Sequence, residues 1–314
     1  MLLHLNKDTF NDLCQIVSQY KGIPKDAVKL DYYIVLLLKN LSISEYKEVV
    51  VFKGGTSLSK CYPNSIERFS EDVDLTYIPA ADAGKKEIEN HLKRIEKIIV
   101  DEHQIEKNKD ERNQRNKSSY VIFEPDSVRI KLEIGSTIIP SPCVKKTIKS
   151  YIQEYLEEIR AVDAIKKFKL EKVEVNALDI SRTFIDKVMA VKRHSVCDNL
   201  SNKVRHIYDV VRLYKLEEIK AFLSKKDIVK KLIIEVKETD SFYLEKRIKN
   251  GNSKCYNAKE NYNFKEWKNK FDSTVKNIYE NLHNRILYTS ERQDFSIAIK
   301  TFEEISGILN SIGE

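Results

Sequence analysis

The sequence contains little glycine, proline or cysteine, and it has no long apolar run. Its 314 residues include 8 Gly and 6 Pro, which excludes a collagen-like chain or a low-complexity linker. The 5 cysteines are odd in number and form no C-x-x-C pair. A disulfide framework and a zinc knuckle are therefore both disfavoured, and a reducing compartment is expected.

Membrane and secretion signals are also missing. The longest fully apolar run spans residues 32–38, whereas a membrane-spanning helix needs about 20 apolar residues. The first residues lack the basic start and the apolar core of a signal peptide. We therefore expect a cytoplasmic protein that has no membrane-spanning segment.

What the chain does have is charge and a change of pattern along its length. The sum of 55 Lys and Arg against 48 Asp and Glu gives +7, which permits a nucleotide or nucleic acid as partner without specifying one. The N-terminal half mixes strand and helix patterns, while helical periodicity alone persists from residue 181 to residue 309. We expect an α+β fold in which a small mixed sheet occupies a domain over residues 1–175 and a helical domain follows over residues 176–314.

Individual elements follow from hydrophobic spacing. Helices are predicted over residues 8–20, 27–40 and 85–100, a short helix from residue 56, and strands over residues 49–52, 73–78, 120–123 and 128–134. The densely charged stretch 103–117 is predicted to be a surface loop.

A glycine pair follows the first predicted strand. Residues 52–59 read Phe-Lys-Gly-Gly-Thr-Ser-Leu-Ser, so Gly54 and Gly55 lie where a strand turns into a helix. Such a helix N-terminus attracts phosphate through its backbone N–H groups, and Thr56 or Ser57 can add a hydroxyl. Taken alone, a Gly-Gly pair is a weak signal, because it is most often an ordinary turn.

Three carboxylates on predicted strands form the second feature. Asp72 and Asp74 are two residues apart and therefore share one strand face, where they repel each other unless a cation lies between them. Oxygen ligands of this kind suit Mg²⁺. On the strand over residues 128–134, Glu133 is the candidate for a third ligand, and its alternative role is that of an exposed Glu paired with Lys131.

These residues in this order resemble a known pattern. Gly-Gly-Thr-Ser, a spacer and Asp-Val-Asp are similar to the signature of the DNA polymerase beta-like nucleotidyltransferase superfamily. The longer motif, which includes Arg-Phe-Ser-Glu-Asp-Val-Asp-Leu at residues 68–75, resembles the motif of the AbiEii-type toxins, the branch that includes the MenT toxins. The resemblance covers about residues 27–215. It includes Asp31, the segment 183–190 around Lys187, and the segment 205–210, where His206 replaces the first Asp of the family pattern and Asp209 keeps the second.

The resemblance implies a nucleotidyltransferase fold and a Mg²⁺-dependent reaction. Asp72, Asp74 and Glu133 would hold two Mg²⁺ ions, and an acceptor hydroxyl would attack the α-phosphorus of an NTP and release pyrophosphate. Residues 54–57 would cradle phosphate oxygens. Lys187 would supply positive charge to the triphosphate, and Asp209 would orient Lys187 or contact the base. Without the family, Lys187 is an ordinary helix Lys with an exposed end, and Asp209 pairs with Arg205 or Arg212.

The expected acceptor is the 3′ end of tRNA, with the chain acting as the toxin of a bacterial toxin–antitoxin system restrained by a cognate antitoxin. Basic and aromatic side chains between residues 241 and 276 offer groups that could contact RNA or that could equally form helix surfaces and core. They are Lys246, Arg247, Lys249, Lys254, Tyr256, Tyr262, Phe264, Trp267, Lys268 and Lys270. The alternatives are transfer to a small molecule or a protein, and a non-catalytic protein that binds nucleotides.

Overall fold

The computed structural model describes residues 2–124, 126–137, 140–249, 258–284 and 286–312. The chain forms two compact units, which are described separately here. The first unit consists of Met1–Tyr62 and Phe69–Leu178, and the second of Pro63–Arg68 and Asp179–Glu314. The short segment Pro63–Arg68 thus groups with the helical part of the chain, which the sequence pattern did not indicate.

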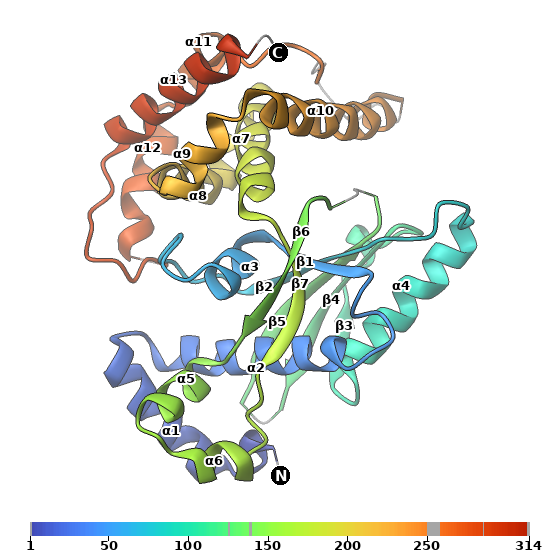
Figure 1. The fold of residues 1–314 in the computed structure, drawn as a ribbon, viewed down its shortest axis with the longest axis vertical. Helices are drawn as coiled ribbons and strands as arrows, with labels where there is room; N and C mark the ends of the chain where they lie inside the picture. The colour runs from blue at the N-terminus through green and yellow to red at the C-terminus, as the bar shows by residue number, and fades with distance from the viewer. Residues whose placement is uncertain (1, 125, 138–139, 250–257, 285, 313–314) are drawn as a thin grey trace. The chain divides into compact units, whose positions relative to one another are not determined.

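A mixed sheet forms the centre of the first unit (Figure 1). Seven strands of the described chain pair in the order β3-β4-β5-β2-β1-β7-β6, with β2–β5 and β1–β7 parallel and the other pairs antiparallel. Their bounds are β1 Val50–Lys53, β2 Asp72–Tyr77, β3 Gln104–Lys107, β4 Asn116–Phe123, β5 Val128–Gly135, β6 Cys143–Ile148 and β7 Val173–Leu178.

Helices cover one face of this sheet. The long helices α2 and α4 contact each other and also contact β4, β5 and β7, so they lie on the same face. Leu92 and Ile95 of α4 are fully buried there. The helical elements of the unit are η1 Leu3–Leu5, α1 Lys7–Lys21, α2 Lys25–Ser42, α3 Gly54–Cys61, α4 Lys85–Val100, η2 Lys109–Glu111, α5 Tyr151–Glu158 and α6 Val162–Lys167.

Strand alternation places apolar and polar side chains on opposite faces. Val73 and Leu75 of β2 and Leu132 of β5 are buried, whereas the residues between them are partly accessible to solvent. Because successive residues of a strand point to opposite faces, the buried set packs toward α2 and α4. The other face of the sheet therefore carries the predicted carboxylates.

Hydrophobic periodicity in the sequence predicted the helices of the first unit better than its edge strand. The expected helices over residues 8–20, 27–40 and 85–100 correspond to α1, α2 and α4, and the expected short helix is α3. The prediction of a surface loop over residues 103–117 was wrong in part, since β3 and the start of β4 lie within it. β3 was missed because it is at the edge of the sheet and is mostly exposed, which leaves it with no apolar face. The start of β4 was missed because its buried residues Lys117, Ser118 and Ser119 are polar.

The second unit is helical where it is described, apart from an isolated bridge between Arg68 and Leu287. The segment Pro63–Arg68 is attached to α8, because the Tyr208 hydroxyl donates a hydrogen bond of 2.7 Å to the Ile66 carbonyl. The helical elements are α7 Ile180–Val196, η3 Leu200–Lys203, α8 Val204–Tyr214, α9 Glu217–Leu223, α10 Lys226–Lys249, α11 Phe264–Trp267, η4 Lys268–Lys270, α12 Ser273–Glu280, η5 Asn281–Asn284 and α13 Phe295–Ser311.

Over the parts of the chain that the structure describes, the helices lack the combination of length and apolar character that crossing a bilayer requires.

Candidate active site

The predicted carboxylates lie on two paired strands of the first unit. Asp72 and Asp74 are the first and third residues of β2 and are partly accessible. The parallel register places Glu133 of β5 opposite Asp74, and Lys131 opposite Asp72. The structure thus brings all three predicted carboxylates to one face of the sheet, at the point where β2 begins.

The turn between β1 and α3 approaches the same carboxylates. Gly54 is the first residue of α3, and its φ of 84° lies in the region that L side chains rarely adopt. A Cβ at Gly54 would lie 2.2 Å from Oδ2 of Asp74. Only glycine fits here, so the backbone at the start of α3 comes directly against the Asp74 carboxylate.

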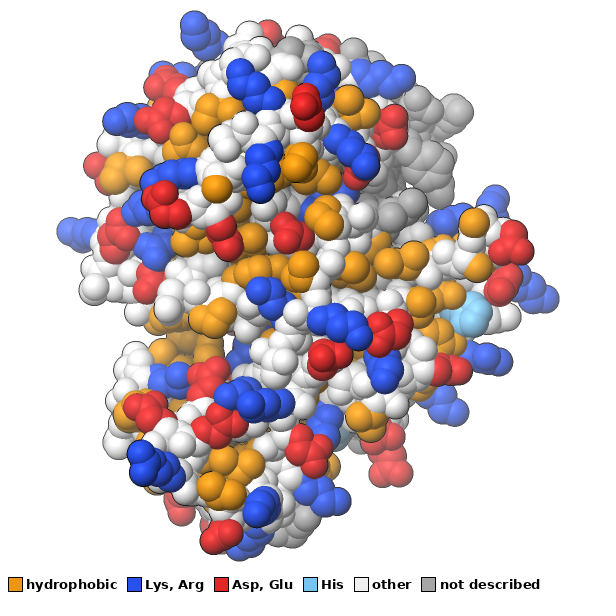
Figure 2. Space-filling view, viewed as in Figure 1, with side chains coloured by type: hydrophobic (Ala, Val, Ile, Leu, Met, Phe, Trp, Pro, Cys, Tyr) orange, Lys and Arg blue, Asp and Glu red, His pale blue; other side chains and the backbone are white. Residues whose placement is uncertain are grey.

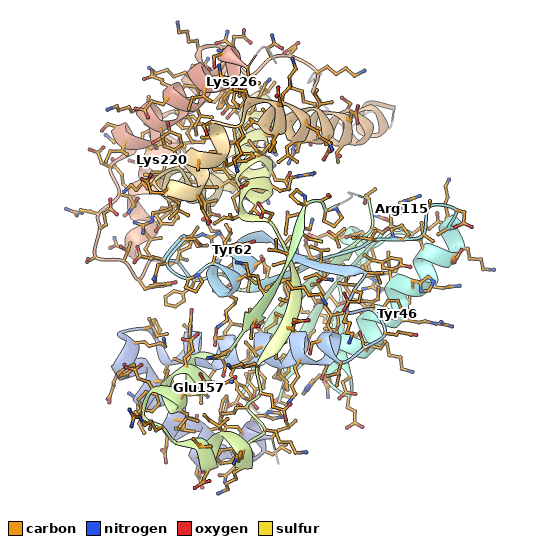
Figure 3. All side chains as sticks on the ribbon, viewed as in Figure 1. Tyr46, Tyr62, Arg115, Glu157, Lys220 and Lys226 are labelled. Carbon is orange, nitrogen blue, oxygen red and sulfur yellow. The ribbon has the colours of Figure 1, made fainter. Side chains whose placement is uncertain are left out.

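The hydroxyls that follow the glycines bond to the protein's own backbone. Thr56 is buried and donates its hydroxyl proton to the Asp72 carbonyl, and Ser57 donates to the Phe52 carbonyl at 3.2 Å. A hydrogen bond also holds the C-terminal end of α3. The hydroxyl of Tyr62 donates to the Leu178 carbonyl at 3.0 Å (Figure 3). These bonds set the direction of α3, which leaves backbone N–H groups as the means by which residues 54–57 would contact phosphate.

Glu133 has a cationic neighbour in this structure. The Lys131 ammonium lies 2.5 Å from Oε1 of Glu133 and 2.8 Å from Oε2 of Glu111. The ion pair with Lys131 is the alternative that strand alternation indicated. Glu111 belongs to the predicted surface loop, and the sequence carried no signal that would have placed it beside Glu133.

The donor set fits Mg²⁺ by its chemistry. Three carboxylates supply the hard oxygen ligands that this ion prefers, and Asp72 and Asp74 share a strand face. Within the described residues, no three His, Cys, Asp or Glu side chains are already gathered as a metal-ligand group. To bind the metal, Glu133 would have to exchange the Lys131 ammonium for it.

The other two predicted residues meet in the second unit. Asp209 of α8 is fully buried and accepts hydrogen bonds from Nε and Nη2 of Arg68 at 2.6 and 2.8 Å. The ammonium of Lys187, on α7, lies 2.7 Å from the same carboxylate. Asp209 therefore pairs with Arg68 and Lys187 rather than with Arg205 or Arg212, and Arg68 is a partner that sequence reasoning missed.

Two cations control the ionisation of this carboxylate. Burial by itself would raise the pKa of Asp209, but the charges and hydrogen bonds of Arg68 and Lys187 outweigh it and hold the pKa far below its usual range. Burial and the charge on Lys187 lower the pKa of His206 well below its usual value. The imidazole is therefore neutral at pH 7, and its Nδ1, 3.4 Å from the Lys187 ammonium, is an acceptor. His206 thus supplies a neutral acceptor where the family pattern has an Asp.

The aromatic residues considered for RNA stacking are core residues. Tyr262, Phe264 and Trp267 are at most 3% exposed, and their rings pack against one another at centroid distances of 4.7 and 5.3 Å. The prediction that these three rings contact RNA is therefore wrong, because a base cannot stack on a ring that solvent does not reach.

The lysine and arginine residues considered for RNA contact in the same region either form ion pairs or lie outside the residues that the structure describes. Lys268 pairs with Glu303 at 2.7 Å and Lys270 with Asp198 at 2.6 Å. Over the face drawn in Figure 2, Lys and Arg alternate with Asp and Glu on both units instead of forming a field of one sign. Lys254 and Tyr256 lie outside the described residues, as do the side chains of Lys246, Arg247 and Lys249.

Comparisons with known proteins gave two solved structures that are similar to this chain. No curated protein was found to match the sequence. A solved structure from H. pylori, described as a candidate nucleotidyltransferase, has 16% identity and a TM-score of 0.44, with 93% of this chain and 98% of that chain covered. MenT4, a nucleotidyltransferase toxin from Mycobacterium tuberculosis H37Rv, has 15% identity and a TM-score of 0.49, with 95% and 98% covered.

The family comparison covers most of the chain. The model of the family described as nucleotidyl transferase AbiEii toxin, type IV toxin–antitoxin system, matches residues 36–298. This range includes the glycine turn, the carboxylates of β2 and β5, and the cluster around Asp209. The chain is therefore a member of the AbiEii family of nucleotidyltransferase toxins of type IV toxin–antitoxin systems.

Proposed function

We propose that this nucleotidyltransferase moves a nucleoside monophosphate from an NTP to the 3′ end of tRNA in a Mg²⁺-dependent reaction. The observation that carries the proposal is the arrangement on β2 and β5, where Asp74 faces Glu133 across one strand pairing and Gly54 abuts Asp74. Carboxylates beside a helix N-terminus suit a metal-bound triphosphate, because the carboxylates attract the cation and the N–H groups attract the phosphates.

The reaction forms one bond and breaks another at the α-phosphorus. The oxygen of an acceptor hydroxyl bonds to that phosphorus, the bond to the bridging oxygen of the β-phosphate breaks, and pyrophosphate leaves with its electron pair. Asp72, Asp74 and Glu133 would hold Mg²⁺, which when bound polarises the phosphate oxygens and makes the hydroxyl more acidic. Glu133 would be the acceptor of the hydroxyl proton, and the N–H groups of residues 54–57 would orient the phosphates.

Lys187 would supply positive charge to the triphosphate. Its ammonium has three N–H donors, of which Asp209 and His206 account for two. Asp209 and Arg68 would act through Lys187, since the buried carboxylate, itself bonded to Arg68, holds the ammonium in one orientation.

A small molecule or a protein is the second class of acceptor. Tyr262, Phe264 and Trp267 are core residues, so they offer no stacking surface that would favour RNA as the acceptor. The same transfer to a small-molecule or protein hydroxyl is therefore the alternative. Family membership supports an NTP as substrate and an antitoxin as partner in either case.

The experiment combines the full-length chain, Mg²⁺, total tRNA and each α-³²P-labelled NTP in turn. Label on tRNA that is absent with Asp74→Asn supports the proposal, and Glu174→Gln, which removes an exposed strand carboxylate on β7, is the matched control. Periodate-oxidised tRNA, which has no 3′-terminal diol, should accept no label. Label on a protein or small molecule but not on tRNA would overturn the tRNA assignment.

A further inference from the structure

The ammonium of Lys131 lies between two carboxylates of the first unit. Its ammonium is 2.5 Å from Glu133 and 2.8 Å from Glu111, and its side chain is 20% exposed, less than either partner. The two carboxylates come from different elements, since Glu133 is on β5 and Glu111 ends η2. One ammonium therefore balances charge from both.

Glu111 is held in place by contacts that do not involve Lys131. The Ser118 hydroxyl donates to Oε2 of Glu111 at 2.9 Å. The Arg115 carbonyl accepts the Ser136 N–H at 3.1 Å, so the loop is tied to the end of β5, and Arg115 is labelled in Figure 3. Arg112, next in the loop, binds both oxygens of the Glu96 carboxylate at 2.6 and 2.7 Å. Glu111 is thus a fixed partner for a lysine on β5.

The strand register places this ammonium within the candidate metal site. Lys131 is opposite Asp72, and Glu133 is opposite Asp74, all on the same face of the sheet. A positive charge here neutralises a carboxylate that the metal would need, so the ammonium and a divalent cation compete for Glu133.

We propose that Lys131 is a positioning residue that occupies Glu133 in the absence of a divalent cation and is retained by Glu111 when Glu133 turns to the metal. The inference rests on the proposed function, because it takes Glu133 as a metal ligand. It assigns Glu111 a role through Lys131: the carboxylate gives the displaced ammonium a partner and so lowers the cost of the exchange. The pair therefore sets how tightly the site binds its cation.

The test is binding of Mn²⁺ to the full-length protein, with free Mn²⁺ measured by electron paramagnetic resonance. Lys131→Gln should bind Mn²⁺ about tenfold more tightly, since a competing charge is removed, and Glu111→Gln about threefold more weakly. Arg129→Gln is the matched control. It removes one charge from the same strand and face, but Arg129 pairs with Glu106 at 2.6 Å and should leave the Kd within about twofold.

The double variant separates an action through Lys131 from an independent effect of Glu111. If Glu111 acts through Lys131, then Lys131→Gln with Glu111→Gln should have the Kd of Lys131→Gln alone. Equal Kd values for Lys131→Gln, Arg129→Gln and the wild type would overturn the inference and leave the proposed function intact.

Two further outcomes are decisive. Mn²⁺ binding by the wild type that Asp74→Asn does not weaken would overturn both the inference and the metal assignment. If circular dichroism shows that Lys131→Gln does not fold, the Glu111→Gln variant decides, and an unchanged Kd for it overturns the inference.

Discussion

Replacing Gly54 by alanine tests the geometry of the candidate site in the most specific way. Two separate costs arise at this position. Its φ of 84° is unfavourable for any L side chain, and the new Cβ would lie 2.2 Å from Oδ2 and 3.1 Å from Cγ of Asp74. Gly22, which ends α1 at a φ of 65°, shares the first cost, but a Cβ there would meet no atom within 4 Å. Gly22→Ala is therefore the matched control.

The magnitudes of the two costs can be separated. A left-handed backbone costs an L residue about 1–2 kcal/mol, so both variants should lose about that much free energy of unfolding. In Gly54→Ala the Asp74 carboxylate must also move by about 1 Å to restore an ordinary contact, and a displacement of about 1 Å in a reacting group can reduce a rate about 100-fold. Transfer should therefore fall about 100-fold in Gly54→Ala and stay near the wild-type rate in Gly22→Ala.

The assays are urea unfolding for stability and transfer of an α-³²P-labelled nucleotide for activity, on both variants side by side. A Gly54→Ala protein that transfers label within about threefold of Gly22→Ala would contradict this prediction, because transfer would then tolerate a displaced Asp74 carboxylate. An equal loss of activity in both variants would point to backbone strain instead of the contact with Asp74.

Three variants of the second unit give the further predictions. Asp209→Asn leaves Arg68 and Lys187 without their buried carboxylate and should lower the free energy of unfolding by about 3–5 kcal/mol in urea titrations at pH 7. Because the pKa of Asp209 is lower in the folded chain than in the unfolded chain, its contribution is complete above the ordinary Asp pKa of about 4 and declines as the pH falls below it. Urea titrations from about pH 7 to about pH 3 should therefore show a loss of stability in the wild type that is smaller in Asp209→Asn, and equal slopes would contradict the pairing. Trp267→Ala should cost about 3–5 kcal/mol of stability without changing RNA affinity in a filter-binding assay, and selective loss of RNA binding would show that the ring is accessible. Lys187→Ala should raise the KM for NTP, and unchanged kinetics would remove this residue from the site.

The two strands that carry the carboxylates could be predicted because apolar and polar residues alternate along them. Val73 and Leu75 are buried while Asp72 and Asp74 remain partly accessible, as a strand with one polar face requires. The parallel pairing of β2 with β5 was not visible in the sequence. It depends on long-range contacts between segments that share no local signal, yet it decides that Glu133 faces Asp74.

The groups around the predicted residues were harder to foresee. Arg68 and Asp209 are far apart in the sequence and meet only because the segment Pro63–Arg68 packs with α8. Glu111 lies in a charged stretch that has the composition of a solvated loop, and its partner Lys131 is on another strand. The aromatic residues near Trp267 showed the opposite failure, since their interleaving with lysine resembled a binding surface although they form a core.

The most direct test of nucleotidyl transfer by Asp72 and Asp74 compares two labels in parallel reactions. The wild type, Asp72→Asn and Asp74→Asn would each be incubated with Mg²⁺, total tRNA and an NTP labelled with ³²P at either the α- or the γ-phosphate. We predict that the α-label is incorporated by the wild type alone and that the γ-label appears in pyrophosphate. Incorporation of the γ-label would mean phosphoryl transfer, and equal incorporation of the α-label by the variants would show that the β2 carboxylates do not carry the reaction. Either result would contradict the account.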